Sequence, residues 1–418
     1  MNSSTAKPRV LVAQLGARRH YLIPLLFQEW GMLDSFYTDF YLKNNQLINF
    51  LRQYKIYNAL PKLVKNGLDR SEQKLKSNNF FWFPFFAYKW LQKQKKCSDK
   101  SALKIWAGHS FCENIIFHKH PKNVDIVYGF NGSCLELFQY AKSRGIRCIL
   151  DQTIAEMSLV HKLLQEEEDL WPNWSLSPFR VKASDRQLLE REQSEQDLAD
   201  RIICGSDFVK NSLIDRGIST DKISAIALGR RRDGASLNVS LNSEKLPAKT
   251  DKLKILFAGT VSLRKGIPYL LQALRQLQGQ IPFSCKVAGS IAIKPERVAE
   301  YSDVCEFLGR VPRSQMTELY RWADVFVFPS ICEGSAMVTH EALSWGLPVI
   351  TTPNSGSIVT DNSNGVIVNI RDTTGIVNNL YRIAENKLKS NHNNPSYTDV
   401  SLDYRWEQEQ LHNLLINI

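Results

Sequence analysis

The chain has 418 residues, of which 43% are hydrophobic and 23% are charged, and its formal net charge is +11. This length exceeds what one hydrophobic core usually organises, so we predict two globular domains. The first apolar stretch, residues 10–14, is too short for a secretory signal or a membrane span, and no later run reaches about 18 apolar residues. The eight cysteines show no Cys-x-x-Cys spacing, which argues against a zinc site or a redox pair. We therefore expect a cytoplasmic protein with reduced thiols.

The positive charge is concentrated near the amino terminus. Residues 1–120 contain 19 Lys or Arg against 7 Asp or Glu, whereas the remainder contains 34 against 35. Within this part, residues 43–104 combine basic residues with an aromatic run at residues 80–90. Basic residues beside aromatic rings suit a peripheral contact with an anionic membrane, but the same rings can equally form a core beneath solvated lysines. Both interpretations stay open, whereas nucleic acid is not an expected partner because no nucleic-acid-binding motif is present.

An apolar stretch at residues 9–13 predicts the first parallel strand, and residues 15–21 predict a loop into a helix. Gly16 would let the backbone approach a ligand in this loop, and Arg18 and Arg19 can each offer forked N–H donors to a phosphate. The alternative is that both arginines decorate a surface turn.

Strands alternate with helices in the rest of this half, which predicts a doubly wound parallel sheet. The expected elements are strands at residues 124–128, 147–151, 201–204 and 222–226, and helices at residues 135–143 and 208–215, the latter capped by Ser206. Asn131 and Asp151 each lie at the carboxyl end of a strand, where such sheets bind ligands, so they are candidates for contacting an acceptor substrate. Residues 229–250 show no periodicity and are predicted to link a first domain, residues 1–228, to a second.

A second alternation occupies residues 251–395. Its expected elements before residue 325 are strands at residues 254–258, 284–288 and 304–308, and helices at residues 268–277 and 314–322. The fold class is therefore α/β, with two Rossmann-like domains of doubly wound parallel sheet facing a cleft. Residues 396–418 are predicted to form a separate C-terminal segment with an amphipathic helix from residue 402.

The loop after the first strand of this second domain lies between Gly259 and Gly266 and carries Arg264 and Lys265 side by side. Arg can bind two oxygens of a diphosphate, Lys adds a compact charge, and the amino end of the following helix adds a favourable field. The loop therefore predicts a diphosphate site, the alternative being a surface Arg–Lys pair.

Residues 325–352 form the most informative unit, with a strand at 325–329, a loop, a helix at 336–345 and a strand at 349–352. Glu333 lies in the loop at the carboxyl end of the first strand, and Glu341 lies on the helix. Eight residues rise about 12 Å along a helix and turn through about 80°, so the two carboxylates are predicted to share a side. One can hold a sugar and the other a ribose.

This unit resembles the Glu-x7-Glu motif of retaining glycosyltransferases of family 4. The flanking residues agree with the family pattern, namely Pro329-Ser330, Glu333-Gly334, Glu341-Ala342-Leu343 and Gly346-Leu347-Pro348-Val349-Ile350. The resemblance is strong over residues 251–385 and holds for residues 1–230 only as a general pattern. It implies the GT-B fold, with the C-terminal helix crossing back to the N-terminal domain.

The resemblance also implies roles for individual residues. Glu333 would contact hydroxyls of the donor sugar, Glu341 would bind the ribose, and Lys265 with Arg264 would bind the phosphates. The backbone near Arg310 would read the nucleobase. The backbone amides expected to point at the donor are those of Gly334, Ser335, Ala336 and Met337.

Two departures from the family pattern stand out. Thr260 occupies a position where relatives often have Arg, and residues 129–133 lack the histidine that many relatives carry after the equivalent strand. The second departure concerns how the acceptor is handled and leaves donor binding unaffected.

The implied reaction transfers a sugar from a UDP- or GDP-sugar to a hydroxyl acceptor with retained anomeric configuration, without a cofactor or a metal. The acceptor classes left open are a polysaccharide, a lipid-linked glycan and a small metabolite. Two other functions remain as alternatives: a catalytically idle nucleotide-sugar-binding partner of a glycan assembly complex, and another GT-B enzyme such as an epimerase. The glutamate pair with Gly334-Ser335 favours transfer.

Overall fold

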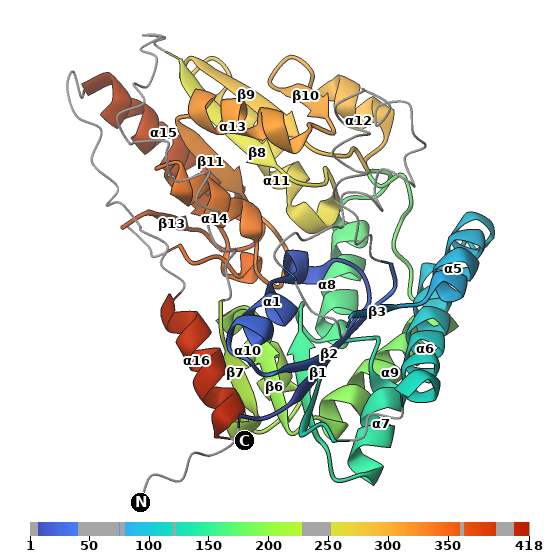
Figure 1. Cartoon of the computed structure of the whole chain (residues 1–418). Coiled ribbons are helices and arrows are strands. Elements are labelled where there is room, and N and C mark those ends of the chain that lie inside the picture. Colours follow the sequence, from blue (N-terminus) through green and yellow to red (C-terminus); the bar gives the residue numbers. More distant parts are fainter. Residues whose placement is uncertain are drawn as a thin grey trace, which may run out of the picture.

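The computed structural model describes residues 7–40, 75, 80–119, 123–227, 252–359, 363–389 and 405–417. The expected linker at 229–250, and residues 43–74 and 76–79 of the basic segment, lie outside this described part. Figure 1 shows two α/β domains, one above the other, with the N-terminal domain below. The arrangement agrees with the fold class expected from the sequence.

The N-terminal domain is built on a seven-stranded parallel sheet in the order β3-β2-β1-β4-β5-β6-β7. Its strands are β1 (Val10–Gln14), β2 (Leu33–Thr38), β3 (Phe80–Trp82), β4 (Ile126–Phe130), β5 (Arg147–Gln152), β6 (Arg201–Cys204) and β7 (Ile223–Ala225). Its helices are η1 (Arg18–Tyr21), α1 (Leu22–Glu29), α5 (Pro84–Lys96), α6 (Lys100–Lys119), α7 (Leu135–Ser143), α8 (Met157–Leu170), α9 (Ala183–Leu198), α10 (Asp207–Asp215) and η2 (Thr220–Lys222). The central strands β1 and β4 are buried along their whole length, as a sheet covered on both faces requires.

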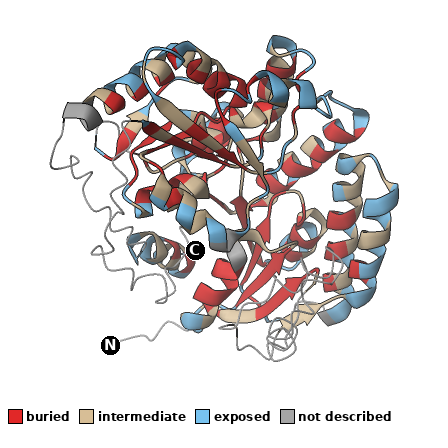
Figure 2. Cartoon of the chain, turned by 90° about the horizontal axis from the view of Figure 1, so that it is seen from above, coloured by how far each residue is buried: buried red, intermediate tan, exposed pale blue. Residues whose placement is uncertain are grey.

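The C-terminal domain is built on a six-stranded parallel sheet in the order β10-β9-β8-β11-β12-β13. Its strands are β8 (Leu253–Ala258), β9 (Phe283–Ala288), β10 (Glu306–Gly309), β11 (Val325–Phe328), β12 (Val349–Thr351) and β13 (Gly365–Ile367). Its helices are η3 (Leu263–Lys265), α11 (Ile267–Leu277), α12 (Pro295–Glu300), α13 (Arg313–Trp322), α14 (Met337–Ser344), η4 (Pro353–Ser355) and α15 (Thr373–Lys389). Figure 2 shows buried residues along the strands of both sheets, with exposed residues on the outer helices.

The expected strands of both domains are present, with boundaries that differ by two residues at most. The sequence patterns did not reveal β2, β3 or β13. Ser206 caps α10 as expected, because its hydroxyl accepts a hydrogen bond from the Val209 amide.

All eight cysteines are unpaired, and seven of them are buried. In the described part of the chain, no helix combines the length and apolarity needed to cross a membrane.

The C-terminal helix α16 (Arg405–Ile416) returns to the N-terminal domain, as Figure 1 shows. Leu411 and Leu415 are buried in the same apolar cluster as residues of β1 and β4. The ring of His412 lies 4.9 Å from that of Trp30. Helix α16 therefore belongs to the core of the N-terminal domain although it follows the C-terminal domain in the sequence.

The aromatic run at residues 80–90 contributes both to the core and to the surface. Phe81 in β3 stacks on Tyr37 with ring centroids 5.0 Å apart, and Phe86 in α5 is buried. Phe85 and Tyr88 on the same helix are 69% and 59% exposed. Part of the run therefore belongs to the core, and the membrane interpretation stays a prediction for the exposed side of α5.

Helix α8 belongs to the first half of the sequence but packs into the core of the C-terminal domain. Leu163 and Trp174 are buried in the same cluster as β8 and β11. The carboxylate of Glu167 accepts hydrogen bonds from the Tyr269 hydroxyl at 2.9 Å and from Arg371 Nε at 2.7 Å. The two domains are therefore joined by direct packing, which fixes the geometry of the cleft between them.

Candidate functional site

A cavity of about 1120 Å³ opens between the carboxyl ends of the strands of the two sheets. The N-terminal domain lines it with the loops after β1, β4 and β5 and with parts of α5, α6 and α9. The C-terminal domain contributes residues of η3, the loop after β11 and the start of α14. This edge is where open α/β sheets bind ligands, so the cavity is the candidate active site.

Arg264 and Lys265 both contact Glu333 at the C-terminal side of the cavity. Lys265 Nζ lies 2.5 Å from Glu333 Oε1, and Arg264 Nη2 lies 3.5 Å from the same oxygen. Burial lowers the pKa of Lys265, and the neighbouring Glu333 carboxylate opposes that shift. Two cations gathered on one carboxylate form a compact positive site to which a diphosphate can bind.

Helix α14 places the second glutamate on the same wall. Glu341 lines the cavity with Glu333, and its Oε2 accepts a hydrogen bond of 2.9 Å from the Tyr320 hydroxyl. The loop before the helix is held in place because the Glu333 amide donates to the Asn354 carbonyl at 2.8 Å. The two carboxylates therefore face one space from separate positions on one strand–loop–helix unit.

The four backbone amides expected to face a donor are not equivalent. Within the described structure, the amides of Gly334 and Ser335 donate to no other residue, and both residues line the cavity, as does Met337. Ala336 is buried, and its amide donates to the Ser355 carbonyl at 3.0 Å. The expectation for Ala336 was therefore wrong, because that amide is already used to hold the loop against η4.

Gly334 is also a point of close contact between the two domains. A Cβ atom added there would lie 1.8 Å from the Thr153 carbonyl oxygen of the N-terminal domain. The Gly334 carbonyl accepts a hydrogen bond of 2.6 Å from the Ser206 hydroxyl, which belongs to the same opposite domain. Only glycine permits this close approach, which sets the width of the cavity at its floor.

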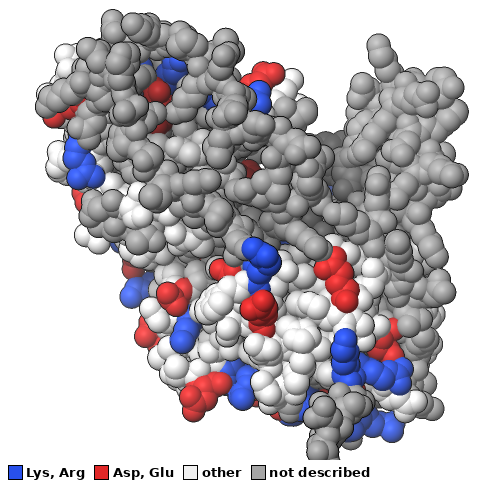
Figure 3. All heavy atoms as spheres, turned by 60° about the vertical axis from the view of Figure 1, so that its left-hand side comes forward, with Lys and Arg blue, Asp and Glu red and all other residues white. Residues whose placement is uncertain are grey.

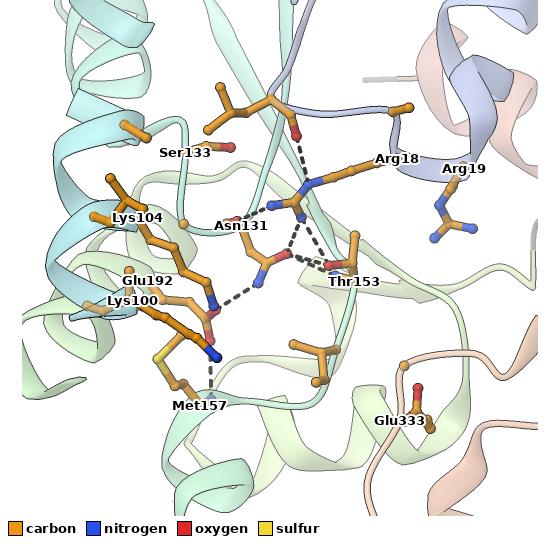
Figure 4. Close-up of a pocket in the computed structure, with 18 of the residues that line it drawn as sticks. Arg18, Arg19, Lys100, Lys104, Asn131, Ser133, Thr153, Met157, Glu192 and Glu333 are labelled. Atoms are coloured by element: carbon orange, nitrogen blue, oxygen red, sulfur yellow. Dashed lines mark hydrogen bonds between the residues drawn. The ribbon is translucent and has the colours of Figure 1, made fainter. Parts of the chain in front are cut away.

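The loop after β1 carries Arg18 into the cavity. Arg19 and Tyr21 have φ angles of 48° and 62°, a left-handed conformation that is unfavourable by about 1 kcal/mol for residues other than glycine. Arg18 Nη1 donates to Asn131 Oδ1 and to Thr153 Oγ1, each at 3.1 Å. Figure 4 shows these three side chains meeting in the cavity. Arg18 and Asn131, two of the expected acceptor-side residues, are thus brought together.

Asp151 is not an acceptor-binding residue in this structure. Its carboxylate is completely buried, accepts a hydrogen bond from Arg19 Nη2 at 3.1 Å and another from the Tyr128 hydroxyl at 2.8 Å, and does not line the cavity. The expectation failed because the end of β5 turns this side chain into the interior. Arg19 lines the cavity, but its guanidinium forms an ion pair with Asp151.

Besides Lys265, which contacts the lining residue Glu333, three further expected residues lie outside the cavity lining. Gly16 donates its amide to Asp39 Oδ1 at 2.8 Å, and Gly259 donates its amide to the Ala288 carbonyl at 2.9 Å. Arg310 is exposed just after β10. Gly259 and Arg310 follow the carboxyl ends of β8 and β10, and Glu333 follows the carboxyl end of β11. They therefore flank the candidate site without forming its wall.

The sequence interpretation missed Glu192 on α9. This carboxylate is completely buried at the inner end of the cavity, where Oε2 accepts a hydrogen bond from Asn131 Nδ2 at 2.8 Å and Oε1 accepts one from the Met157 amide at 3.2 Å. Burial raises its pKa to about 7, against the effect of these hydrogen bonds. No local pattern marks Glu192, because its partners lie 61 and 35 residues away.

Lys100 and Lys104 of α6 were also missed, although they lie within the basic segment 43–104. Both line the cavity, and Figure 4 shows their ammonium groups pointing into it beside Glu192. In the described ranges, no group of three or more His, Cys, Asp or Glu side chains is placed to hold a metal ion. The charged side chains that line the cavity are arginines, lysines and glutamates.

Comparisons with known proteins point to one family. Residues 252–386 match the model of the family described as glycosyl transferases group 1. The chain is 29% identical over 203 residues to a D-inositol 3-phosphate glycosyltransferase of Xylanimonas cellulosilytica, which covers 46% of each protein. It is 26% identical over 205 residues to an uncharacterized glycosyltransferase of Methanocaldococcus jannaschii, covering 45% of this chain and 51% of that protein. The chain thus spans about half the length of these curated relatives.

Solved structures resemble the chain over nearly its whole length. It matches WaaG, a glycosyltransferase involved in lipopolysaccharide biosynthesis, with a TM-score of 0.60 at 14% identity, covering 97% of this chain and 99% of that one. It matches HepE of Anabaena in complex with UDP and glucose with a TM-score of 0.55 at 13% identity, covering 98% and 100%. These likenesses show the fold, so the chain has the GT-B arrangement of two parallel-sheet Rossmann-like domains.

Proposed function

We propose that this protein is a retaining glycosyltransferase that moves a sugar from a nucleotide-diphosphate sugar to a hydroxyl acceptor. The observation that carries the proposal is the meeting of Arg264 and Lys265 on Glu333, where Arg264 and Glu333 line the cavity together with Gly334 and Ser335. That wall lies within the segment that matches the glycosyl transferases group 1 model. HepE, a structural relative, has been solved with UDP and with UDP-glucose, so uridine diphosphate sugars are the first donors to test.

In the proposed reaction, the bond between the anomeric carbon and the β-phosphate oxygen breaks while a bond to the acceptor oxygen forms on the same face. Negative charge then grows on the leaving diphosphate, where Arg264 and Lys265 stabilise it. The acceptor hydroxyl passes its proton to the leaving phosphate oxygen. Glu333 positions the two cations and accepts hydrogen bonds from the donor sugar, and Glu341 binds the ribose. The scheme needs no protein nucleophile.

The first experiment is a thermal-shift panel of UDP-, GDP- and ADP-sugars with the purified full chain. A ligand that binds only the folded state raises the melting temperature, so a shift with one base identifies the donor class. The variant Lys265→Met should lose most of this shift. Arg275→Met is the matched control, because Arg275 binds Asp303 on the surface away from the cavity. Equal shifts in both variants, or none with any nucleotide sugar, would contradict the donor site.

Binding alone does not separate a transferase from an idle partner or an epimerase. Product analysis with the donor identified in this way makes that distinction. Transfer or slow hydrolysis that releases the nucleoside diphosphate, with the α or β configuration of the donor kept, supports the proposal. An inverted product would contradict the retaining mechanism, conversion of one nucleotide sugar into another would indicate an epimerase, and binding without turnover would indicate an idle partner.

We further propose that the outer side of α5 contacts the inner face of an anionic membrane. Phe85 and Tyr88 are exposed there, and Lys89 and Lys93 line an open groove next to them. Aromatic rings at headgroup depth with lysines beside them suit such a surface. On the α16 side of the molecule, by contrast, Figure 3 shows Lys and Arg interspersed with Asp and Glu over the described surface.

Co-sedimentation with phosphatidylglycerol vesicles tests this contact. Binding should weaken as salt rises and should fall in the double variant Phe85→Ser/Tyr88→Ser. Trp406→Ser is the control, because Trp406 is also largely exposed but lies on α16. Equal binding of all three proteins, or binding that does not respond to salt, would refute a role for α5.

A further inference from the structure

Besides Arg19, which forms an ion pair with Asp151, three cations line the N-terminal wall of the cavity, and the proposed donor site does not use them. Lys100 and Lys104 come from the first turns of α6, and Arg18 comes from η1. Figure 4 shows the two lysine ammonium groups projecting into the same space, with Arg18 beside Asn131, to which it donates a hydrogen bond. Neither lysine forms a hydrogen bond or an ion pair with any residue that the structure describes.

The positive charges of Lys100 and Lys104 repel each other, and no ion pair with a described residue offsets this repulsion. They are four residues apart on one helix, so their side chains lie on the same face and the like charges are unfavourable by a few tenths of a kcal/mol. Lys104 is accessible to water because the cavity is open, yet protein surrounds its ammonium group. Burial lowers its pKa, and Arg18 and Arg264 lower it further than Glu192 and Asp185 raise it. Positive charge therefore converges on this wall from both domains.

The carboxylate nearest to these cations does not neutralise them. Glu192 is buried, and its two oxygens accept hydrogen bonds from Asn131 and from the Met157 amide. Because its pKa is raised to about 7, it is only partly ionised near neutral pH. Arg18 donates four hydrogen bonds, to Leu15, Asn131 and Thr153. At least one of its five N–H groups therefore remains for a ligand. The wall thus keeps a surplus of positive charge facing the acceptor side of the cavity.

We propose that the acceptor carries a phosphate group and that Lys100, Lys104 and Arg18 bind it. This inference rests on the proposed transferase function, because it concerns the second substrate of the same cavity. A phosphate with up to two negative charges is matched by two ammonium groups and a guanidinium, whereas a neutral sugar would leave the charges of Lys100 and Lys104 without a counter-charge. The rest of the acceptor would lie against the apolar part of this wall, which Trp90, Leu103 and Leu188 provide.

The phosphate can belong to a soluble sugar phosphate or to a lipid-linked one. Both share the chemistry that the wall recognises. Helix α5 connects the two cases, because Trp90 and Cys97 on and just after it line the cavity while Phe85 and Tyr88 on its outer side are exposed. The experiment therefore has one arm for the phosphate itself and another for its source.

The first arm is isothermal titration of inorganic phosphate into the full chain, with and without saturating UDP. The test variant is Lys100→Gln/Lys104→Gln. The control is Lys95→Gln/Lys96→Gln, which removes the same charge from the end of α5 without touching the cavity lining. We expect the phosphate affinity to fall about tenfold or more in the test variant and less than about twofold in the control, with UDP affinity unchanged in both.

Two results would overturn the inference. One is phosphate binding that is equal in the test and control variants. The other is phosphate binding that UDP abolishes, because the anion would then occupy the donor site at Arg264 and Lys265. Failure of UDP to bind would instead contradict a uridine donor, and phosphate binding that still depends on Lys100 and Lys104 would support the anionic subsite on its own.

The second arm identifies the source of the phosphate. For this arm the control is Lys210→Gln/Lys294→Gln, because Lys96 lines the groove on α5 that is itself proposed to contact the membrane, whereas Lys210 and Lys294 line neither that groove nor the cavity. If the phosphate belongs to a lipid, Lys100→Gln/Lys104→Gln should bind phosphatidylglycerol vesicles more weakly than this control variant does. If it belongs to a soluble molecule, vesicle binding should be the same for both variants, and glucose 6-phosphate should compete with inorganic phosphate. Vesicle binding equal in both variants, together with no displacement by glucose 6-phosphate, would contradict both sources and with them the proposal.

Discussion

The contact at Gly334 allows a direct test of whether the two domains must meet for catalysis. The perturbation is Gly334→Ala, which adds one methyl group at the floor of the cavity. That methyl carbon would lie 1.8 Å from the Thr153 carbonyl oxygen, whereas Cβ atoms essentially never come closer than 3.0 Å to such an atom. The two loops must therefore separate by at least 1.2 Å, the difference between these distances. Both groups belong to the backbone, so no side-chain rotation relieves the clash.

The effect on catalysis should be much larger than the effect on folding. Overpacking of this kind typically destabilises a protein by about 1–3 kcal/mol. In the proposed function the acceptor and the donor are held by different domains, and a displacement of about 1 Å between reacting groups can lower the rate about 100-fold. The same movement would lengthen the 2.6 Å hydrogen bond from Ser206 to the Gly334 carbonyl beyond a useful length. Donor binding should change little, because Arg264, Lys265 and Glu333 all belong to one domain.

The assay combines the kcat for transfer with the Kd for UDP measured by calorimetry. For Gly334→Ala we expect kcat to fall about 100-fold and Kd to change less than about threefold. Ser206→Ala is the comparison, because it removes the interdomain hydrogen bond without a clash and should lower kcat less than about tenfold. A folded Gly334→Ala protein with kcat within threefold of wild type would refute the reasoning, since the domains would not meet there in the reacting state. Equal losses of kcat and UDP affinity would place the effect in donor binding.

Three further predictions follow from other contacts. Lys265→Met and Glu333→Gln should each lower kcat about 100- to 1000-fold, but only Lys265→Met should also weaken UDP binding in calorimetry, because only it removes a phosphate contact; equal UDP affinities in all proteins would count against this assignment. Burial raises the pKa of Glu192 to about 7 from 4.5, so the stability it confers is full below pH 4.5 and is lost, on the order of 3 kcal/mol, as pH rises through 7. The melting temperature of Glu192→Gln should therefore decline less than that of wild type between pH 5 and 8, and parallel curves would contradict the raised pKa. Arg371→Met should destabilise the protein by about 2 kcal/mol in urea unfolding because it leaves Glu167 buried without its ion pair, and Glu167→Gln in the same chain should restore part of the loss.

The donor side of the cavity could be predicted from sequence because its information is local. Glu333, Glu341, Arg264 and Lys265 lie in two strand–loop–helix units in which glycines and prolines mark the turns. The structure brings Arg264 and Lys265 into contact with Glu333, a contact that the sequence interpretation did not include, and the roles expected for these residues stay predictions. Ala336 was an error of detail, since the sequence does not reveal that the Ser355 carbonyl takes its amide proton.

The acceptor side could not be predicted in the same way because its information is distributed along the chain. Glu192 lies in a stretch rich in charged residues that reads as a solvated helix face, yet its partners Asn131 and Met157 bury it. Lys100 and Lys104 read as part of a basic segment, and only the packing of α6 against α9 and α7 turns them towards the cavity. Asp151 shows the converse error, because a strand-end carboxylate that should face the cleft is used inside the domain by Arg19 and Tyr128.

This asymmetry has a physical basis in how the two substrates differ. A diphosphate is small, highly charged and the same in every nucleotide sugar, so one loop with adjacent cations and one helix terminus can bind it. An acceptor is larger and specific to each enzyme, so the wall that binds it must draw residues from several helices, here η1, α5, α6 and α9. In this chain those helices place Arg18, Lys100 and Lys104 around one space, and neither lysine forms an ion pair with a residue that the structure describes. The choice of acceptor is therefore expected to follow changes at these positions, while the choice of donor follows the unit around Glu333.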